Sequence, residues 1–152
     1  MLNDQVTSLS VSDPAGSNQS SDAIKSYLFN GVIEPLLIQG DVLTILKRIP
    51  SESIDMIMTS PPYWNQREYD SGGIGLEKNY QEFINLLLEI TVELKRVLKP
   101  TGSFWLNMND TYQNKHLLGI PWRIALKMID EQGWILRNEG LWYKKYAHYT
   151  QP

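Results

Sequence analysis

The sequence predicts an α/β fold built around a mostly parallel, doubly wound sheet. Short apolar runs of strand length alternate along the chain with longer segments whose apolar residues repeat with helical spacing. Prolines and glycines separate these segments, and polar residues follow the ends of the expected strands. Ligands of such sheets bind outside the carboxyl ends of the strands, so these polar residues form the candidate site.

Residues 1–23 are expected to form a flexible tail. They are rich in Ser, Asn, Asp and Gln and carry only scattered apolar side chains, so burial cannot offset the entropy lost on ordering. The organised domain is expected over residues 24–152, beginning with a short helical turn that ends at Gly31.

The first expected strand covers residues 35–39 and is stopped by Gly40-Asp41. Residues 42–49 place their apolar side chains on one helical face, and a turn is expected at 50–53. A second, buried strand is expected at 54–59. The chain then enters a loop that contains the candidate site.

The strongest helical pattern covers residues 80–98, where the apolar side chains form one stripe. The segment 99–102, Lys-Pro-Thr-Gly, is expected to end this helix. A third strand is expected at 103–108, a helix at 121–133 with proline at its start and glycine at its end, and a fourth strand at 134–143.

Polar residues follow each of these strands and are expected to converge on one crevice. They are Gly40-Asp41, Ser60 to Tyr63, Asn107 to Asp110, and Lys144.

Two prolines end the second strand, because neither has an N–H group to continue a sheet ladder. Ser60 and Pro61 are then held extended with free carbonyls, and Pro62, Tyr63 and Trp64 follow. A polar side chain, free carbonyls and an aromatic ring suit a flat ligand that carries an amino group. The alternative is a strand-ending turn whose aromatic rings pack in the core. We call residues 59–64 the elbow.

The composition excludes several classes of site. Without cysteine the chain has no disulfide, no thiolate zinc site and no cysteine nucleophile. Its two histidines, His116 and His148, lack metal-ligand spacing, so no metal is expected. The net charge of -3 indicates no basic surface for nucleic acid. We find no run long enough to span a membrane and no signal peptide, so a cytoplasmic protein is expected.

The elbow could act on the exocyclic amino group of a nucleobase. This group is a poor nucleophile because its lone pair is delocalised into the ring. Acceptors such as Ser60 and the Pro61 carbonyl can draw it toward a tetrahedral geometry, while the ring of Tyr63 or Trp64 stacks on the base, worth about 1–3 kcal/mol. The base must first be flipped out of the duplex. The lack of cysteine excludes methylation at cytosine carbon 5 through a thiolate adduct.

The elbow, Thr-Ser-Pro-Pro-Tyr-Trp, resembles the catalytic motif of the amino-methylating DNA methyltransferases that use S-adenosylmethionine. The resemblance covers residues 33–146 and implies a partial Rossmann-like methyltransferase fold acting on double-stranded DNA. Further similar segments follow the family's order: Gly40-Asp41-Val42-Leu43, residues 93–102, Asn109-Asp110-Thr111-Tyr112, Gly133-Trp134 and residues 141–144.

The resemblance implies that Ser60, Pro61, Pro62 and Tyr63 bind the target amino group. Serine at the first motif position goes mainly with cytosine 4-amino methylation in this family, so cytosine is preferred over adenine as the target. Tyr63 would also stack on the base.

Two further roles follow from the resemblance. Trp142 or Tyr143 would pack on the other face of the flipped base, and Asp41 would lie near the adenine of the cofactor. Each has a simpler alternative: Trp142 as a core residue, and Asp41 as the cap of the helix that begins at Val42.

Two parts of the family pattern are missing. The sequence contains no Phe-x-Gly-x-Gly turn for the cofactor and no basic region of a size to read DNA. The chain resembles the first half of a methyltransferase whose segments occur in a circularly permuted order. Cofactor binding is therefore expected to need a complementing chain. Self-association of the chain is the other way in which its open sheet edge could be covered. One alternative is a non-catalytic fragment or regulatory subunit. Another is a nucleotide-binding module, but the lack of a glycine-rich phosphate turn argues against that module.

Overall fold

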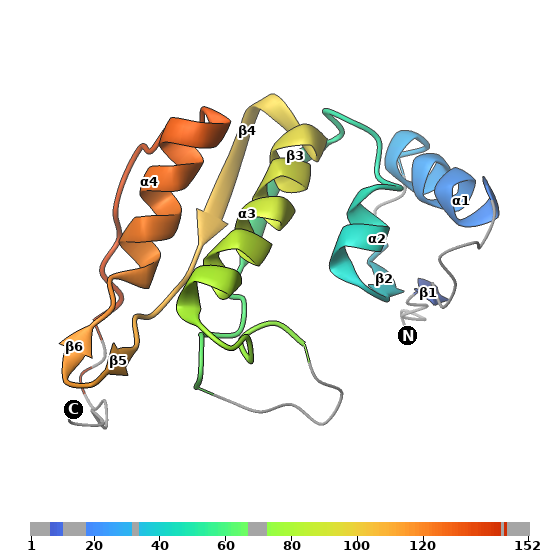
Figure 1. Ribbon diagram of the computed structural model, residues 1–152. Coiled ribbons are helices and arrows are strands. Elements are labelled where there is room, and N and C mark those ends of the chain that lie inside the picture. The colour runs from blue at the N-terminus through green and yellow to red at the C-terminus, as the bar shows by residue number, and fades with distance from the viewer. Residues whose placement is uncertain (1–6, 11–17, 32–33, 67–72, 144, 146–152) are drawn as a thin grey trace. The chain divides into compact units, whose positions relative to one another are not determined.

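The computed structural model describes residues 7–10, 18–31, 34–66, 73–143 and 145 (Figure 1). The chain divides into two compact units. The first unit comprises Met1–Ile57 and Val92–Trp105, and the second comprises Met58–Thr91 and Leu106–Pro152.

The N-terminal part of the first unit differs from the expected tail. Strand β1, Thr7–Ser10, pairs in parallel with β2, Leu36–Gln39, and helix α1 covers Asn18–Phe29. Strand pairing uses main-chain groups, which polar residues possess as well as apolar ones, and Ile24 anchors α1 by burial. Residues 1–6 and 11–17 of the expected tail lie outside the described residues.

Helix α2, Val42–Leu46, is shorter than expected. After α2 the hydrogen bonds span three residues instead of four. The N–H of Arg48 donates to the carbonyl of Ile45, and the N–H of Ile49 donates to the carbonyl of Leu46. Pro50 explains this end, because the residue before a proline is disfavoured in the helical region.

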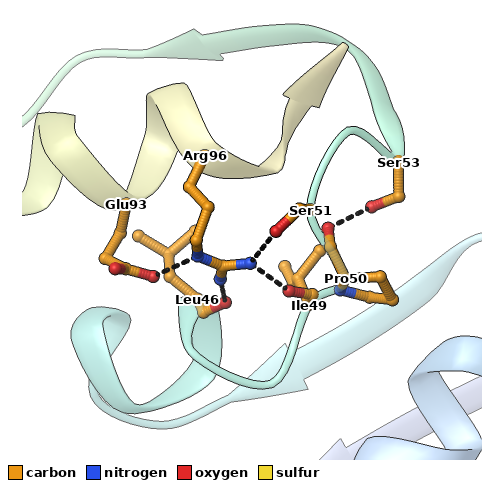
Figure 2. A network of polar contacts seen from close by, with 7 residues as sticks. All are labelled: Leu46, Ile49, Pro50, Ser51, Ser53, Glu93 and Arg96. Carbon is orange, nitrogen blue, oxygen red and sulfur yellow. Dashed lines mark hydrogen bonds and ion pairs between the residues drawn. The ribbon is translucent and has the colours of Figure 1, made fainter.

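Arg96 closes the turn between α2 and the next strand, as Figure 2 shows. Its guanidinium donates to the carbonyls of Leu46 (2.7 Å) and Ile49 (3.0 Å) and to the hydroxyl of Ser51 (3.1 Å). Glu93 accepts from the Nε of Arg96 at 2.9 Å. One side chain of helix α3, Tyr80–Val97, therefore adds a second donor to the Leu46 carbonyl and supplies a donor to the Ile49 carbonyl.

Strands β3, Ile54–Thr59, and β4, Leu98–Leu106, form a two-stranded sheet. The N–H of Ser53 donates to the carbonyl of Val97 near the start of both strands, and the N–H of Asn107 donates to the carbonyl of Thr59 at their ends, each at 2.9 Å. The two strands consequently run parallel.

Helix α3 ends just before the segment 99–102, as expected, but β4 begins directly after the helix, so the expected strand start at 103 is wrong. Within this strand, Gly102 lies very close to Leu98 and to the main chain of Asp55. A Cβ atom at this position would lie 2.8 Å from Leu98 Cγ and 2.9 Å from the carbonyl oxygen of Asp55. Only glycine allows this close approach, and Lys99 pairs with Asp55 at 2.7 Å beside it.

Helix α3 confirms the strongest helical prediction, to within one residue at its end. Asn79 caps it: its Oδ1 accepts from the N–H of Glu82 at 2.9 Å, and its Nδ2 donates to the Glu82 carboxylate at 2.8 Å. The buried apolar residues of this helix are Phe83, Ile84, Leu87, Leu88, Ile90, Leu94 and Val97.

Helix α4, Ile120–Gln132, also lies where the sequence predicted a helix, with Gly133 in the left-handed conformation at its end. A hairpin precedes it that the sequence did not predict: β5, Tyr112–Gln113, pairs antiparallel with β6, His116–Leu117. Its turn residues, Asn114 and Lys115, both have positive φ.

The expected fourth strand at 134–143 is wrong, because these residues form neither helix nor strand. A strand needs a neighbour to pair with, and the described residues form three separate two-stranded sheets. The described chain is thus a mixed α/β structure with small parallel sheets. No described helix is long and apolar enough to cross a membrane.

Candidate active site

The elbow leaves β3 at Thr59, where the two prolines end the ladder as the sequence predicted. Ser60 is exposed, whereas Pro61, Pro62 and Tyr63 are half-buried. The polar side chain of the elbow is therefore accessible, and the residues after it are held by their surroundings.

Trp64 anchors the elbow in the second unit. It is 5% exposed, its indole N–H donates to the carbonyl of Glu77 at 3.1 Å, and its ring meets the Tyr80 ring edge-on at 6.1 Å. Thr111 donates its hydroxyl to the Trp64 carbonyl at 2.9 Å. Of the two aromatic residues of the elbow, Trp64 is thus a core residue, and base stacking by Tyr63 stays a prediction.

The loop that returns to α3 passes close behind the elbow at Gly75. A Cβ atom here would lie 3.2 Å from the Tyr63 carbonyl and 3.3 Å from Pro62 Cβ, and the φ of Gly75 is +106°. Its N–H donates to the carboxylate of Glu77, while its carbonyl accepts from Asn65 at 2.8 Å. The positive φ favours glycine at this position, and the close approach leaves little room for a side chain.

Three polar side chains meet at the elbow. Asn107 donates from Nδ2 to the Ser60 hydroxyl oxygen at 3.2 Å and to the Tyr63 hydroxyl oxygen at 3.4 Å. The two hydroxyl oxygens lie 3.5 Å apart. We call Ser60, Tyr63 and Asn107 the polar triad. Its hydrogen bonds are long for such groups, so they have room to tighten around a ligand.

Asn107 was predicted from the sequence to be one of the polar residues that follow a strand, but no role in the site was predicted for it. Its position just beyond the carboxyl end of β4, the neighbour of β3, is the signal that brings it to Ser60. That signal depends on which strands pair and in what register.

Asp110, expected in the same crevice, is occupied by main-chain donors. Its carboxylate accepts from the N–H groups of Thr111 (2.8 Å), Gly119 (2.7 Å) and Ile120 (3.0 Å). It satisfies donors at the start of α4, where a negative charge is also favourable. Its role is to hold the hairpin and α4 together.

Asp41 caps α2, accepting from the N–H of Thr44 at 2.9 Å. The hydrogen bonds from the Thr44 main chain and side chain hold the pKa of the Asp41 carboxyl below its ordinary value. The capping alternative is therefore confirmed, and a contact with a cofactor stays a prediction. Asp41 belongs to the first unit and the polar triad to the second.

Trp142 and Tyr143 lie in the segment after α4 and are 75% and 76% exposed. Trp142 is consequently no core residue, and base stacking by either ring stays a prediction. His116 is exposed in β6, and His148 lies outside the described residues. Over the described ranges no group of three or more His, Asp or Glu residues could hold a metal ion.

A family model described as DNA methylase matches residues 54–151, which include the elbow, the polar triad and α4. The chain belongs to the DNA methylase family. The match confirms the resemblance to amino-methylating methyltransferases that the motifs indicated.

The DNA methylase chain is similar to two curated relatives, one of which is described as an adenine methyltransferase. It is 37% identical to the type II methyltransferase M.XycI of Xanthomonas campestris pv. cyanopsidis, over 73% of this chain and 47% of the relative. It is 35% identical to the DNA adenine methyltransferase YhdJ of Escherichia coli (strain K12), over 72% of this chain and 36% of the relative. The chain thus spans half or less of the length of these relatives.

A solved structure supports the same family. The PvuII DNA methyltransferase, described as cytosine-N4-specific, is 31% identical and gives a TM-score of 0.52 over 63% of this chain and 33% of that chain. The described fold therefore corresponds to part of a methyltransferase.

Proposed function

We propose that this DNA methylase chain is the catalytic-motif part of a site-specific DNA methyltransferase of a restriction-modification system. It acts on the exocyclic amino group of a base flipped from double-stranded DNA. The observation that carries the proposal is the polar triad, in which the exposed Ser60 hydroxyl lies 3.2 Å from Asn107 beside two prolines that cannot pair in a sheet.

In this reaction the residues of the chain bind and orient the target base. Ser60 and the Pro61 carbonyl accept hydrogen bonds from the target amino group and direct its lone pair outward. Tyr63 stacks on the base, and the buried Trp64 keeps the elbow rigid from behind. Trp142 covers the other face of the base.

S-adenosylmethionine supplies the methyl group when it is bound. Asp41 is the one residue assigned toward it, and the carboxylate is already engaged as a helix cap. The sequence contains no Phe-x-Gly-x-Gly turn. The described residues do not by themselves fit the cofactor, so we derive no step through it.

Cytosine is the proposed target, with the product methylated at its 4-amino group. Serine at the first position of the motif supports this choice, as does the similarity to a solved methyltransferase described as cytosine-N4-specific. The adenine 6-amino group is the alternative target, favoured by the similarity to YhdJ.

A complementing polypeptide, or a second copy of this chain, completes a Rossmann-like, doubly wound sheet in our proposal. The observation that supports it is the exposure of the apolar residues after α4. Those residues are Ile135, Leu136, Leu141, Trp142 and Tyr143.

A second candidate is a non-catalytic fragment or regulatory subunit that keeps the fold and the elbow. The lack of a Phe-x-Gly-x-Gly cofactor turn in the sequence supports it. It predicts binding to a partner chain without methyl transfer.

Complementation distinguishes the two candidates. The chain alone should bind no measurable S-adenosylmethionine by calorimetry. Co-expression with a polypeptide that carries Phe-x-Gly-x-Gly and a recognition region should give transfer of labelled methyl groups to DNA. A complex that forms and binds the cofactor but transfers no methyl group would establish the non-catalytic alternative.

A further inference from the structure

We infer that Asn107 is a positioning residue that directs a lone pair of Ser60 toward the target amino group, through hydrogen bonds donated by its side-chain amide. The inference rests on the proposed function and adds a residue to it.

Asn107 is held in place by its main chain. Its N–H donates to the carbonyl of Thr59 at 2.9 Å, and Thr59 directly precedes Ser60. The side chain therefore starts from a point fixed against the elbow, and only two side-chain torsions separate it from the hydroxyls of Ser60 and Tyr63. Its contacts of 3.2 Å and 3.4 Å are both made by Nδ2, which carries two N–H bonds.

The hydrogen-bond donors and acceptors around Ser60 determine how many acceptor positions of its hydroxyl remain free. A serine hydroxyl has one hydrogen and two acceptor positions, and the Nδ2 of Asn107 is a donor only. Asn107 fills one acceptor position of Ser60, and the Ser60 hydrogen must point away from it. Either hydroxyl of the Ser60–Tyr63 pair, 3.5 Å apart, could be the donor, and we take Ser60 as the donor to the Tyr63 oxygen. One acceptor position remains on an exposed hydroxyl.

That remaining position is what the proposed reaction needs. A freely rotating hydroxyl presents either its hydrogen or a lone pair to the base, and a hydrogen aimed at the amino group would compete with activation. With Asn107 in place, the hydroxyl presents a lone pair in one direction. Misplacing a reacting group by about 1 Å can cost about 100-fold in rate, so losing this orientation should slow the chemical step more than binding.

The test compares two variants of similar shape in the complemented enzyme, the chain together with its completing polypeptide. Asn107→Leu removes the amide, and Asn107→Asp keeps an acceptor but cannot donate to either hydroxyl. We expect both to lower the single-turnover rate of methyl transfer by about 10- to 100-fold. The Kd for DNA and the fluorescence of 2-aminopurine at the target position, which reports base flipping, should remain unchanged. Asn85→Leu and Asn85→Asp, at an exposed site on α3, serve as controls.

An Asn107→Asp enzyme with the wild-type rate would overturn the inference, because it would show that donation is unnecessary. Equal losses in DNA binding and base flipping would overturn it too, since they would indicate a structural role. A wild-type enzyme without methyl transfer would instead refute the proposed function.

The arrangement can also be tested in the chain alone by NMR. The two side-chain amide protons of Asn107 should shift in Ser60→Ala and in Tyr63→Phe, because each variant removes one acceptor. Resonances that move in neither variant would contradict the contact on which the inference depends.

Discussion

Thr111 donates its hydroxyl to the main-chain carbonyl of Trp64 at 2.9 Å, and both residues are at least 95% buried. The two residues lie 47 positions apart in the chain. This bond joins the segment after β4 to the elbow behind Ser60 and Tyr63. It keeps a buried carbonyl satisfied at a place where prolines have removed two main-chain donors.

Thr111→Val should therefore destabilise the chain. Valine has nearly the shape of threonine but cannot donate, so the Trp64 carbonyl would be left buried without its partner. We expect the free energy of unfolding to fall by about 1–3 kcal/mol in urea denaturation. Thr101→Val, at an exposed position in β4, is the matched control. Equal stabilities for the two variants would contradict the role of this bond.

Gly102→Ala should also be destabilising. The new Cβ would lie 2.8 Å from Leu98 and 2.9 Å from the Asp55 carbonyl, so the start of β4 would have to shift. A loss of about 1–3 kcal/mol in the free energy of unfolding is expected from such overpacking. Gly140→Ala, where nothing lies within 4 Å of the added atom, should have little effect. If the two variants melt alike, β4 does not approach β3 as closely as described.

Arg96→Lys should weaken the turn after α2 although it keeps the charge. A lysine ammonium cannot reach Leu46, Ile49 and Ser51 with the geometry of a planar guanidinium. We expect a loss of about 2 kcal/mol in the free energy of unfolding. Lys25→Met, at an exposed position of α1, controls for changes of basic side chains. An unchanged unfolding midpoint for Arg96→Lys would show that the Arg96 contacts contribute nothing.

Asp41 should make stability depend on pH at the acid end. Its pKa is lowered in the folded chain, so its contribution is complete above the ordinary value of 3.8 and is lost as pH falls through the folded value. Asp41→Asn keeps a capping group without a charge and should flatten this part of the stability profile. Asp41→Ala should lower stability by about 1 kcal/mol at neutral pH. Chemical denaturation between pH 2 and 7 measures both, and superimposable profiles for wild type and Asp41→Asn would refute the lowered pKa.

The features that the sequence predicted correctly depend on local patterns. Helices α3 and α4 follow from apolar periodicity with glycine or proline at a boundary, and the end of β3 follows from two residues without N–H groups. Ser60 lies where the sheet ladder ends for this local reason, and its side chain is exposed there.

The features that the sequence missed depend on pairing between distant segments. Strand β1 pairs with β2 through main-chain groups, so its polar composition was misleading. Residues 134–143 have a strand-like pattern but no paired neighbour in the described chain. Asn107 joins Ser60 because β4 lies beside β3, and neither residue reveals that register by its type.

In the proposed reaction, Ser60 activates the amino group of a cytosine in DNA. The most direct measurement is mass spectrometry of nucleosides from DNA treated with the complemented enzyme and labelled S-adenosylmethionine. We expect a labelled methyl group on the 4-amino group of cytosine with the wild type, and none with Ser60→Ala although its complex still forms and binds DNA. Undiminished methylation by Ser60→Ala would contradict it.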